Sequence, residues 1–248
     1  MKQSKLEERM RLGECYHGLR VPPGLYIVVR VDGRSFSRLT ERLVEKPFDP
    51  TFHRWMVTAA RGLLDTLQAR YVYTESDEIS ALLPRDADLF DREVEKLASI
   101  SAARASALFS LACGEAVEFD GRLWVGARDQ DVVDYFRWRQ SDATRCALNG
   151  WCHWTLRKAG KSASQASRAI EGLSVSAKNE LLHRHEINFN EVPAWQRRGT
   201  GLSREEYQRE GFNPKTQEKV LARRRRIRVD DELPMKDAYS AYLRAMLG

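Results

Sequence analysis

The sequence predicts an α+β fold: an antiparallel sheet of the ferredoxin-like, split β-α-β type, flanked by helices and followed by a helical and irregular C-terminal part. Two observations lead to this class. From residue 25 to residue 127 the local patterns follow one another as strand, helix, hairpin, helix and strand, the order of a split β-α-β unit. From residue 128 onward, apolar side chains recur at helical intervals as far as Trp154, and residues 188–234 are polar without a regular period.

The first half of this unit is a strand and a helix. Residues 25–31, LYIVVRV, form an apolar run that is typical of a buried strand. Asp49 followed by Pro50 predicts the start of a helix, because aspartate caps free amides and proline fits the first helical position. One face of that helix is apolar, at Phe52, Met56, Ala59, Leu63 and Leu67.

The second half is a hairpin, a helix and further strands. The segments YVYT (71–74) and ISALL (79–83) flank ESDE, which predicts a hairpin with an acidic tip. Asp86 is expected to cap a long helix, and residues 115–127 are expected to form two strands around an Asp120-Gly121 turn. A final helix is expected at 235–246.

The composition is that of a globular protein without a membrane segment. The 248 residues carry a formal charge of +6, with 31% charged and 42% hydrophobic residues. No apolar run of about 18 residues occurs, and the N-terminus lacks the apolar centre of a secretion signal, so we expect a cytoplasmic protein with no membrane partner. Four cysteines without a C-x-x-C pair favour free thiols over a zinc site.

Three basic clusters favour a polyanionic partner. They are RWRQ (137–140), WQRR (195–198) and ARRRRIR (222–228), and the first two combine arginine with tryptophan. Arginine holds phosphates, and aromatic rings stack on bases. Any one cluster is equally well explained as a solvated face that complements an acidic segment such as DDE (230–232); the three together favour nucleic acid.

A carboxylate ends the first strand, where VDG (31–33) leaves the buried run. An Asp-Gly turn explains Asp32 on its own. In a split β-α-β sheet, however, the first strand lies beside the hairpin, so Asp32 and Asp77 are expected to converge. Two carboxylates and the carbonyl of Gly33 suit Mg²⁺, and two such ions can align an attacking hydroxyl and stabilise a leaving pyrophosphate. The pattern therefore indicates metal-dependent phosphoryl or nucleotidyl transfer, as in polymerase palms and nucleotide cyclases, with an exposed acidic hairpin as the alternative.

Six motifs make this interpretation more specific. RVDGRSF, SDEIS, FDGR, DYFRWRQSDA, AKNELL and INFNEVPAWQRRGT occur in this order between residues 25 and 201. In order and spacing they resemble the histidine-tRNA guanylyltransferase family, and within it the guanylyltransferase-like 3′-to-5′ polymerases. The combination of DYFRWRQ, KNE and RRGT is the specific part, since DGR or SDE alone is a weak signal.

The resemblance implies a polymerase palm-like catalytic core at residues 1–140, with the Mg²⁺ and nucleotide site, and a helical, basic part at 141–248 that completes the core and contacts tRNA. Members of the family add nucleotides to the 5′ end of tRNA, opposite in direction to ordinary polymerases. ATP activates a 5′-monophosphate by adenylylation, whereas a 5′-triphosphate is attacked directly by the 3′-hydroxyl of GTP or another nucleoside triphosphate. A homotetramer is the implied assembly.

The same resemblance assigns residues by motif. Asp32 and Asp77 are the expected side-chain ligands of two Mg²⁺ ions, with the carbonyl of Gly33, and Glu78 joins them in the predicted catalytic set. The predicted nucleotide-binding residues are Arg30, Gly33, Arg34, Ser35, Phe36, Ser37, Ser76 and Lys96. The predicted tRNA-binding residues are Arg137, Arg139, Arg145, Lys178, Asn179, Arg197 and Arg198.

One segment departs from the family pattern. Members that act on histidine tRNA carry a stretch resembling HINNLYN after WRQSDA, whereas residues 144–150 here are TRCALNG, with Thr144 at the histidine position. The arginines can hold phosphates whatever the sequence. We therefore predict template-directed repair of 5′-truncated tRNAs, with a dedicated guanylyltransferase for histidine tRNA as the alternative. A nucleotide cyclase or a non-catalytic RNA-binding module is less favoured, because the first leaves WRQ, KNE and RRGT without a role and the second leaves the acidic residues without one.

Overall fold

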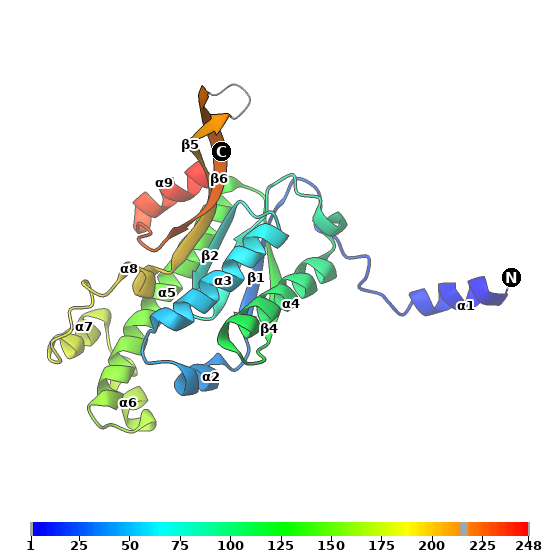
Figure 1. Ribbon diagram of the computed structural model, residues 1–248. Helices are drawn as coiled ribbons and strands as arrows, with labels where there is room; N and C mark the ends of the chain where they lie inside the picture. Colours follow the sequence, from blue (N-terminus) through cyan, green and yellow to red (C-terminus); the bar gives the residue numbers. More distant parts are fainter. Residues whose placement is uncertain (1, 214–217, 248) are drawn as a thin grey trace.

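In the computed structural model, which describes residues 2–213 and 218–247, six strands form one sheet in the order β4-β1-β3-β2-β5-β6 (Figure 1). Every pairing between neighbouring strands is antiparallel. This arrangement confirms the predicted α+β class with an antiparallel sheet. The strands are β1 (Tyr26–Gly33), β2 (Tyr71–Glu75), β3 (Glu78–Leu82), β4 (Phe119–Gly126), β5 (Thr200–Asn213) and β6 (Glu218–Asp230).

Helices cover both faces of the sheet (Figure 1). On one face lie α3 (Pro50–Thr66) and α4 (Val94–Cys113), and on the other lie α5 (Asp129–Lys158) and α9 (Lys236–Leu247). The predicted cap of α3 is confirmed, since the Asp49 side chain accepts a hydrogen bond from the amide of Thr51. Shorter helices are α1 (Lys2–Arg11), α2 (Phe36–Leu43), η1 (Leu89–Arg92), α6 (Ala163–Ile170), α7 (Val175–His183) and α8 (Ala194–Arg198).

The central strand β1 contributes to the core on both sides. Val29 and Val31 pack in the cluster that contains Phe109 of α4, whereas Val28 packs in the cluster that contains Phe136 of α5. Successive side chains of a strand point to opposite faces, so a strand that is covered on both sides needs apolar residues at nearly every position. This requirement explains why residues 26–31 are almost continuously apolar.

The predicted start of the long helix is wrong. Asp86 does not cap it; the short helix η1 intervenes, and α4 begins at Val94. Within η1, Phe90, Asp91 and Arg92 have positive φ angles of 55°, 53° and 58°, and the extended residue Glu93 then separates η1 from α4. Left-handed backbone at three consecutive non-glycine residues is not signalled by hydrophobic periodicity.

The predicted turn at Asp120-Gly121 is also wrong, because residues 119–126 form the single strand β4. Gly121 lies in the middle of the strand, opposite Val31. A Cβ atom at Gly121 would lie 2.5 Å from the backbone oxygen of Ala98 on α4. The glycine is therefore required by the close approach of a helix, and not by a turn.

Within residues 188–234, which were expected to be irregular, β5 and β6 form a long hairpin that extends the sheet (Figure 1). The strands were missed because charged residues replace the usual apolar alternation. Glu205 and Glu206 lie opposite Arg226 and Arg225, and each of these cross-strand neighbours forms an ion pair. Opposite charges at facing positions stabilise an antiparallel pair without an apolar face.

The C-terminal part is joined to the rest through α5 and β5. The predicted boundary at residue 140 falls inside α5, and β5 pairs directly with β2. Beyond the sheet, the second half of α5 packs with α7 in a smaller apolar cluster that contains Leu148, Cys152 and Leu182. Within the described residues, no helix is long and apolar enough to span a membrane.

We expect Gly121→Ala to lower the free energy of unfolding by roughly 1–3 kcal/mol, because the added methyl meets backbone that cannot rotate away. Urea unfolding followed by circular dichroism measures this change. Gly150→Ala is the matched control: it lies in α5, an added Cβ has no described atom within 4 Å, and alanine is favoured in a helix by roughly 0.5–1 kcal/mol. Equal effects of the two substitutions would contradict this account.

Candidate active site

Asp32 and Asp77 meet at one end of the sheet. β1 pairs with β3 so that Asp32 lies directly opposite Glu78, the residue that follows Asp77. The amide of Gly33 donates a hydrogen bond to the carbonyl oxygen of Asp77 at 3.0 Å, which attaches the end of β1 to the turn between β2 and β3. The structure therefore brings the two carboxylates and Gly33 together.

The electrostatics of the pair favour a cation. Burial raises the pKa of Asp77 to about 6, and the charge of Asp32 adds to this effect. Burial also raises the pKa of Asp32, followed by the charge of Asp120. A raised carboxyl pKa means that the surrounding protein stabilises the negative charge of the carboxylate less well than water does. A divalent cation would supply the missing charge, and carboxylate oxygens beside a backbone carbonyl are donors that Mg²⁺ prefers.

Glu78 has a different environment, since Arg139 of α5 holds it. The carboxylate is 5% exposed, and its two oxygens accept hydrogen bonds from Nε and Nη2 of Arg139, each at 2.7 Å. The same guanidinium lies 3.3 Å from a carboxylate oxygen of Glu75 and 3.3 Å from one of Asp142. Burial raises the pKa of Glu75 to about 8, and the charge of Glu78 adds to it. The cluster is a buried bridge between α5 and the β2–β3 hairpin.

This burial argues against the predicted tRNA contact of Arg139, which is only 6% exposed and lies among three carboxylates. Arg137, two positions earlier, is exposed. Residues two positions apart on a helix do not share a face, so the RWRQ cluster divides between the interior and the surface. The amino-acid composition of the RWRQ cluster does not show which of its arginines is buried.

The predicted phosphate-binding turn leads into α2. The amide of Gly33 is bonded to Asp77 and that of Arg34 to the carbonyl oxygen of Glu118. Ser35 has a left-handed φ of 62°, and α2 then begins at Phe36 without a side-chain cap among the described residues. The first amides of a helix that lack such a cap suit an anion. The Phe36 ring packs against the backbone of Gly33 and belongs to a buried aromatic cluster with Phe52, Phe109 and Phe119.

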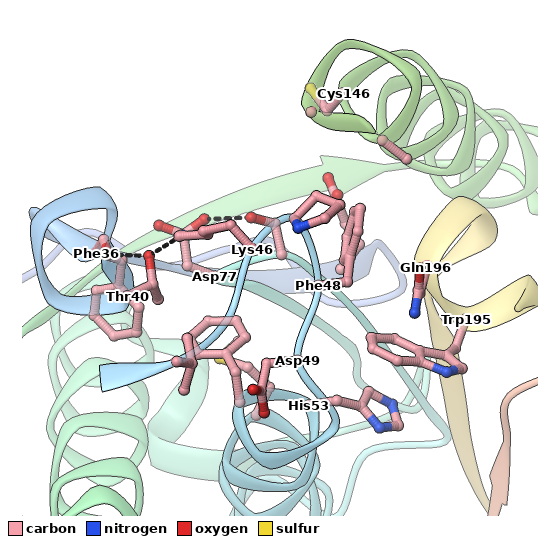
Figure 2. A pocket seen from close by; sticks show the side chains of 18 of the residues that line it. Phe36, Thr40, Lys46, Phe48, Asp49, His53, Asp77, Cys146, Trp195 and Gln196 are labelled. Atoms are coloured by element: carbon pink, nitrogen blue, oxygen red, sulfur yellow. Dashed lines mark hydrogen bonds between the residues drawn. The ribbon is translucent and has the colours of Figure 1, made fainter. Parts of the chain in front are cut away.

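A cavity of about 340 Å³ opens beside Asp77. Figure 2 shows Phe36, Thr40, Lys46 and Asp77 on one side of it, and His53, Trp195 and Gln196 on the other. Elements from both halves of the chain form its wall, namely α2, the start of α3, the β2–β3 turn, α5 and α8. The wall combines aromatic and aliphatic side chains, such as Phe48 and Met56, with many polar and charged ones, such as Lys46 and Asp77. Apolar surface together with placed polar groups is typical of a small-molecule site.

Sequence reasoning missed several residues of this cavity. Lys46 donates a hydrogen bond to the Thr40 hydroxyl, and burial lowers its pKa although Glu41 and Asp77 oppose the shift. His53 stacks on Trp195 with ring centroids 4.4 Å apart, and its Nε2 lies 3.2 Å from a carboxylate oxygen of Asp231. Lys46 belongs to the segment KPFDP (46–50). From the sequence this segment is recognisable only as a loop that leads into a helix cap, so it gave no indication of a binding site.

The other predicted nucleotide-binding residues lie at different distances from the cavity. Ser37 and Ser76 line it, and the Ser76 hydroxyl donates to Asp77 at 3.0 Å. Arg30 is on β1, 3.8 Å from Glu78. Arg34 is exposed and pairs with Glu118 at 2.9 Å. Lys96 is in the first turn of α4, where it pairs with Glu93 at 3.0 Å, and it is not among the described residues that line the cavity.

The predicted tRNA-binding residues are scattered along the C-terminal part. Arg145 is exposed on α5 and pairs with Asp142. Arg197 and Arg198 of α8 are half-buried and donate to the main-chain oxygens of Val192 and Leu233. Two further positions, Lys178 and Asn179, are half-buried on α7.

Comparison with protein families gives a match over nearly the whole chain. Residues 7–137 match the family model described as Thg1, tRNAHis guanylyltransferase, and residues 130–236 match the Thg1 C-terminal domain. The chain belongs to the tRNA(His) guanylyltransferase family. This is a family of nucleotidyltransferases, in agreement with the resemblance seen in the motifs.

Individual relatives agree with the assignment to this family. The tRNA(His) guanylyltransferase of Debaryomyces hansenii is 32% identical over 84% of this chain and 86% of its own length. The tRNA(His) guanylyltransferase 1 of Arabidopsis thaliana is 31% identical over 73% of this chain, which spans only 34% of that longer protein. A bacterial tRNA(His) guanylyltransferase (Thg1)-like protein, solved in complex with ATP, superposes with a TM-score of 0.76 and 26% identity over 98% of this chain and 99% of the other. A complex described in the same words but with GTP has a TM-score of 0.73, at 28% identity and the same coverage.

In a metal-free buffer with chelator, we expect Asp77→Asn to stabilise the protein above pH 6 by roughly 1–3 kcal/mol. The folded-state pKa of Asp77, about 6, exceeds the ordinary value of 3.8, so ionisation of the carboxyl opposes folding as the pH rises through this window. The advantage of the variant should shrink below pH 6 and vanish near pH 4. Thermal unfolding between pH 4 and 8 measures it, and Asp237→Asn, at a fully exposed carboxylate, is the control. A pH-independent difference would contradict the assignment.

Arg139→Met is expected to lower the free energy of unfolding by about 3–5 kcal/mol, because it leaves Glu78 and Glu75 buried without their partner. Arg137→Met removes a guanidinium from the exposed face of the same helix and should change stability by less than about 1 kcal/mol. Urea unfolding at pH 7.5 compares the two. Similar small losses in both variants would show that the buried bridge does not hold the hairpin.

Proposed function

We propose that this protein is a Mg²⁺-dependent nucleotidyltransferase that adds nucleotides to the 5′ end of tRNA in the 3′-to-5′ direction and selects them by pairing with the opposite strand. The observation that carries the proposal is the convergence of Asp32 and Asp77 at the side of a cavity of about 340 Å³. Such a cavity accommodates a nucleoside, and the family of the chain transfers nucleotides.

The side chains of Asp32 and Asp77, with the carbonyl of Gly33, would hold the metal. Bound Mg²⁺ would neutralise phosphate charge and orient the reacting oxygens. The protein's own contribution begins at the N-terminus of α2, whose first amides and the Ser37 hydroxyl face a triphosphate. Lys46 adds a cation beside Asp77.

The aromatic wall of the cavity would hold the base. Phe48 and Trp195 pack edge to face with centroids 6.0 Å apart, and both line the cavity together with the carboxylate of Asp49. Flat apolar walls with one or two polar groups bind and orient a nucleobase. Support for nucleotide binding comes from the bacterial Thg1-like protein, whose solved complexes contain ATP and GTP.

Template-directed choice is supported by the environment of TRCALNG. The Thr144 hydroxyl lies 2.8 Å from the main-chain oxygen of Arg197 and 3.0 Å from that of Gln140, and it shares its one proton with these acceptors, so it is engaged inside the protein. Ala147 and Leu148 are buried, 2% and 5% exposed. Arg145 and Cys146 of the same segment are exposed. The position where the family pattern has histidine, Thr144, is engaged inside the protein and is therefore a poor candidate for reading the bases of one tRNA. We further infer a homotetrameric assembly from the family resemblance.

A second candidate is guanosine addition to histidine tRNA. The names of the relatives from Debaryomyces and Arabidopsis, both tRNA(His) guanylyltransferases, favour it. The two candidates share the metal site and the nucleotide cavity. They differ in whether the tRNA or the template base determines the product.

The test is a panel of histidine and other tRNAs, full-length and lacking the first nucleotide, each offered the four nucleoside triphosphates one at a time. We expect addition to truncated tRNAs of several kinds, following Watson–Crick complementarity, with both 5′-monophosphate (ATP present) and 5′-triphosphate ends. Guanosine addition restricted to histidine tRNA and insensitive to the opposite base would establish the second candidate instead. A cyclic nucleotide formed without RNA would overturn both.

In the same assay Asp32→Asn should lower the rate of addition by at least about a thousandfold, because the charge that holds the metal at the reacting phosphate is lost. Its affinity for tRNA should remain within about threefold of the wild type, since tRNA affinity comes mainly from phosphate contacts. The matched control is Asp237→Asn, which removes one carboxylate whose side chain is fully exposed. Near-wild-type turnover of Asp32→Asn would remove the basis of the metal assignment.

A further inference from the structure

An exposed tryptophan lies on the α5 face of the sheet, near Asp32 but outside the nucleotide cavity. Trp138 is 54% exposed, whereas most large aromatic residues of this chain are buried or half-buried. It follows Arg137 on α5 and is not among the described residues that line the cavity. A single exposed apolar residue is ordinary on a protein surface, so its surroundings decide whether it has a role.

The ring is supported from below by two other aromatic residues. Tyr135, one turn earlier on α5, contacts Trp138 with centroids 5.9 Å apart, and Trp124 of β4 contacts Tyr135 at 4.9 Å. The Tyr135 hydroxyl is hydrogen-bonded to that of Ser80 on β3 at 2.9 Å. These contacts fix the position of Trp138 relative to the sheet, so that its exposed surface is a rigid platform.

Two guanidinium groups lie beside the platform, and one of them, that of Arg139, is already paired with carboxylates. The Cζ atom of Arg139 lies 4.6 Å from the centroid of Trp138, and that of Arg30 lies 5.9 Å from it. Arg30 stands directly opposite Arg122 in the β1–β4 pairing, and like charges at facing positions destabilise a sheet. Arg122 is paired with Asp120. The buried Nε of Arg30 has no hydrogen-bond partner among the described residues; it lies 3.8 Å from a carboxylate oxygen of Glu78, whose two oxygens are already held by Arg139. An anion beside Arg30 would relieve both costs.

The platform lies on the same face of the sheet as Asp32. Arg30 and Asp32 are two positions apart on β1, so their side chains leave the same face. The groove beside Trp138 continues towards Asp131 and Asp134, whose charges repel phosphate. A phosphate bound next to the Trp138 ring is therefore expected beside Arg30, which does not line this groove and lies two positions from Asp32 on β1.

We propose that the base at the 5′ end of the RNA stacks on Trp138 while its phosphate faces Arg30. The surface then positions the end of the acceptor stem for the addition reaction, with the incoming nucleotide in the cavity on the other side of Asp77. This inference rests on the proposed function, and it adds a specific residue and a specific part of the RNA. Stacking is tolerant of base identity, as an enzyme that accepts several tRNAs requires.

The experiment measures tRNA affinity by fluorescence anisotropy at fixed ionic strength. The RNA carries its label at the 3′ end, and its 5′-terminal nucleotide either has its base or is abasic. Trp138→Leu should weaken binding of the intact RNA by about tenfold, because base–aromatic stacking is lost, and should leave the abasic RNA unchanged. Trp138→Phe keeps a ring and should recover most of the affinity. Leu111→Ala, at an 82% exposed apolar residue of α4 on the opposite face of the sheet, is the control and should bind like the wild type.

Equal affinities of wild type and Trp138→Leu for the intact RNA would overturn the inference. The same loss with intact and abasic RNA would also overturn it, because the contact would then not involve the base. A change in oligomeric mass without a change in RNA affinity would identify the surface as an interface between copies of the chain. Nucleotide addition by the wild type is measured in parallel, so that failure of the proposed function can be distinguished from failure of the stacking contact. If the wild type neither binds nor extends tRNA, both the proposed function and the stacking contact are overturned.

Discussion

The register between β1 and β3 is the constraint on which the site depends. With Asp32 opposite Glu78, the end of β1 lies against the hairpin turn, and the Gly33 amide reaches the carbonyl oxygen of Asp77. A shift by one residue would turn Asp32 to the other face of the sheet, since side chains alternate along a strand. It would also turn the charged side chains of Arg30 and Asp32 towards the apolar cluster that contains Val29 and Val31, so core packing opposes the shift and fixes the position of Asp32.

The carboxylates at this end of the sheet are balanced in two different ways. Arg139 balances Glu78 from within the protein, through two hydrogen bonds of 2.7 Å. Among the described residues Lys46 is the cation beside Asp77, but burial and the charge of Asp32 still raise the pKa of Asp77 to about 6. The charge of Glu78 is therefore balanced within the folded chain, whereas the charges of Asp32 and Asp77 can be balanced by a ligand from solution. Glu78 therefore supports the hairpin, and the proposed metal site uses Asp32 and Asp77.

Sequence patterns predicted the parts of this protein that follow local rules. The buried strand, the Asp49 cap and the acidic hairpin each depend on a few neighbouring residues, and so does the expectation that Asp32 lies near Asp77. The β5–β6 hairpin was not predicted because its stability comes from cross-strand charge pairs such as Glu205 with Arg226, which a search for apolar alternation does not detect. The cavity wall was not predicted either, because His53 and Trp195 are brought together only by the tertiary fold. Burial separated Arg139 from Arg137, although the two are identical in type and adjacent in the motif.

The pairing of β5 with β2 has a consequence for how the protein folds. The hydroxyls of Tyr71 and Tyr239 are 3.0 Å apart across 168 positions of sequence, and His53 reaches Thr200 across 147. Contacts between such distant segments close long loops and slow the search for the native state. During synthesis, the first half of the chain emerges with β2 as an unpaired sheet edge, which is a site for association with other chains. The cavity wall can form only after α8 and β5 have emerged, so catalytic competence should arise late, when almost the whole chain is available.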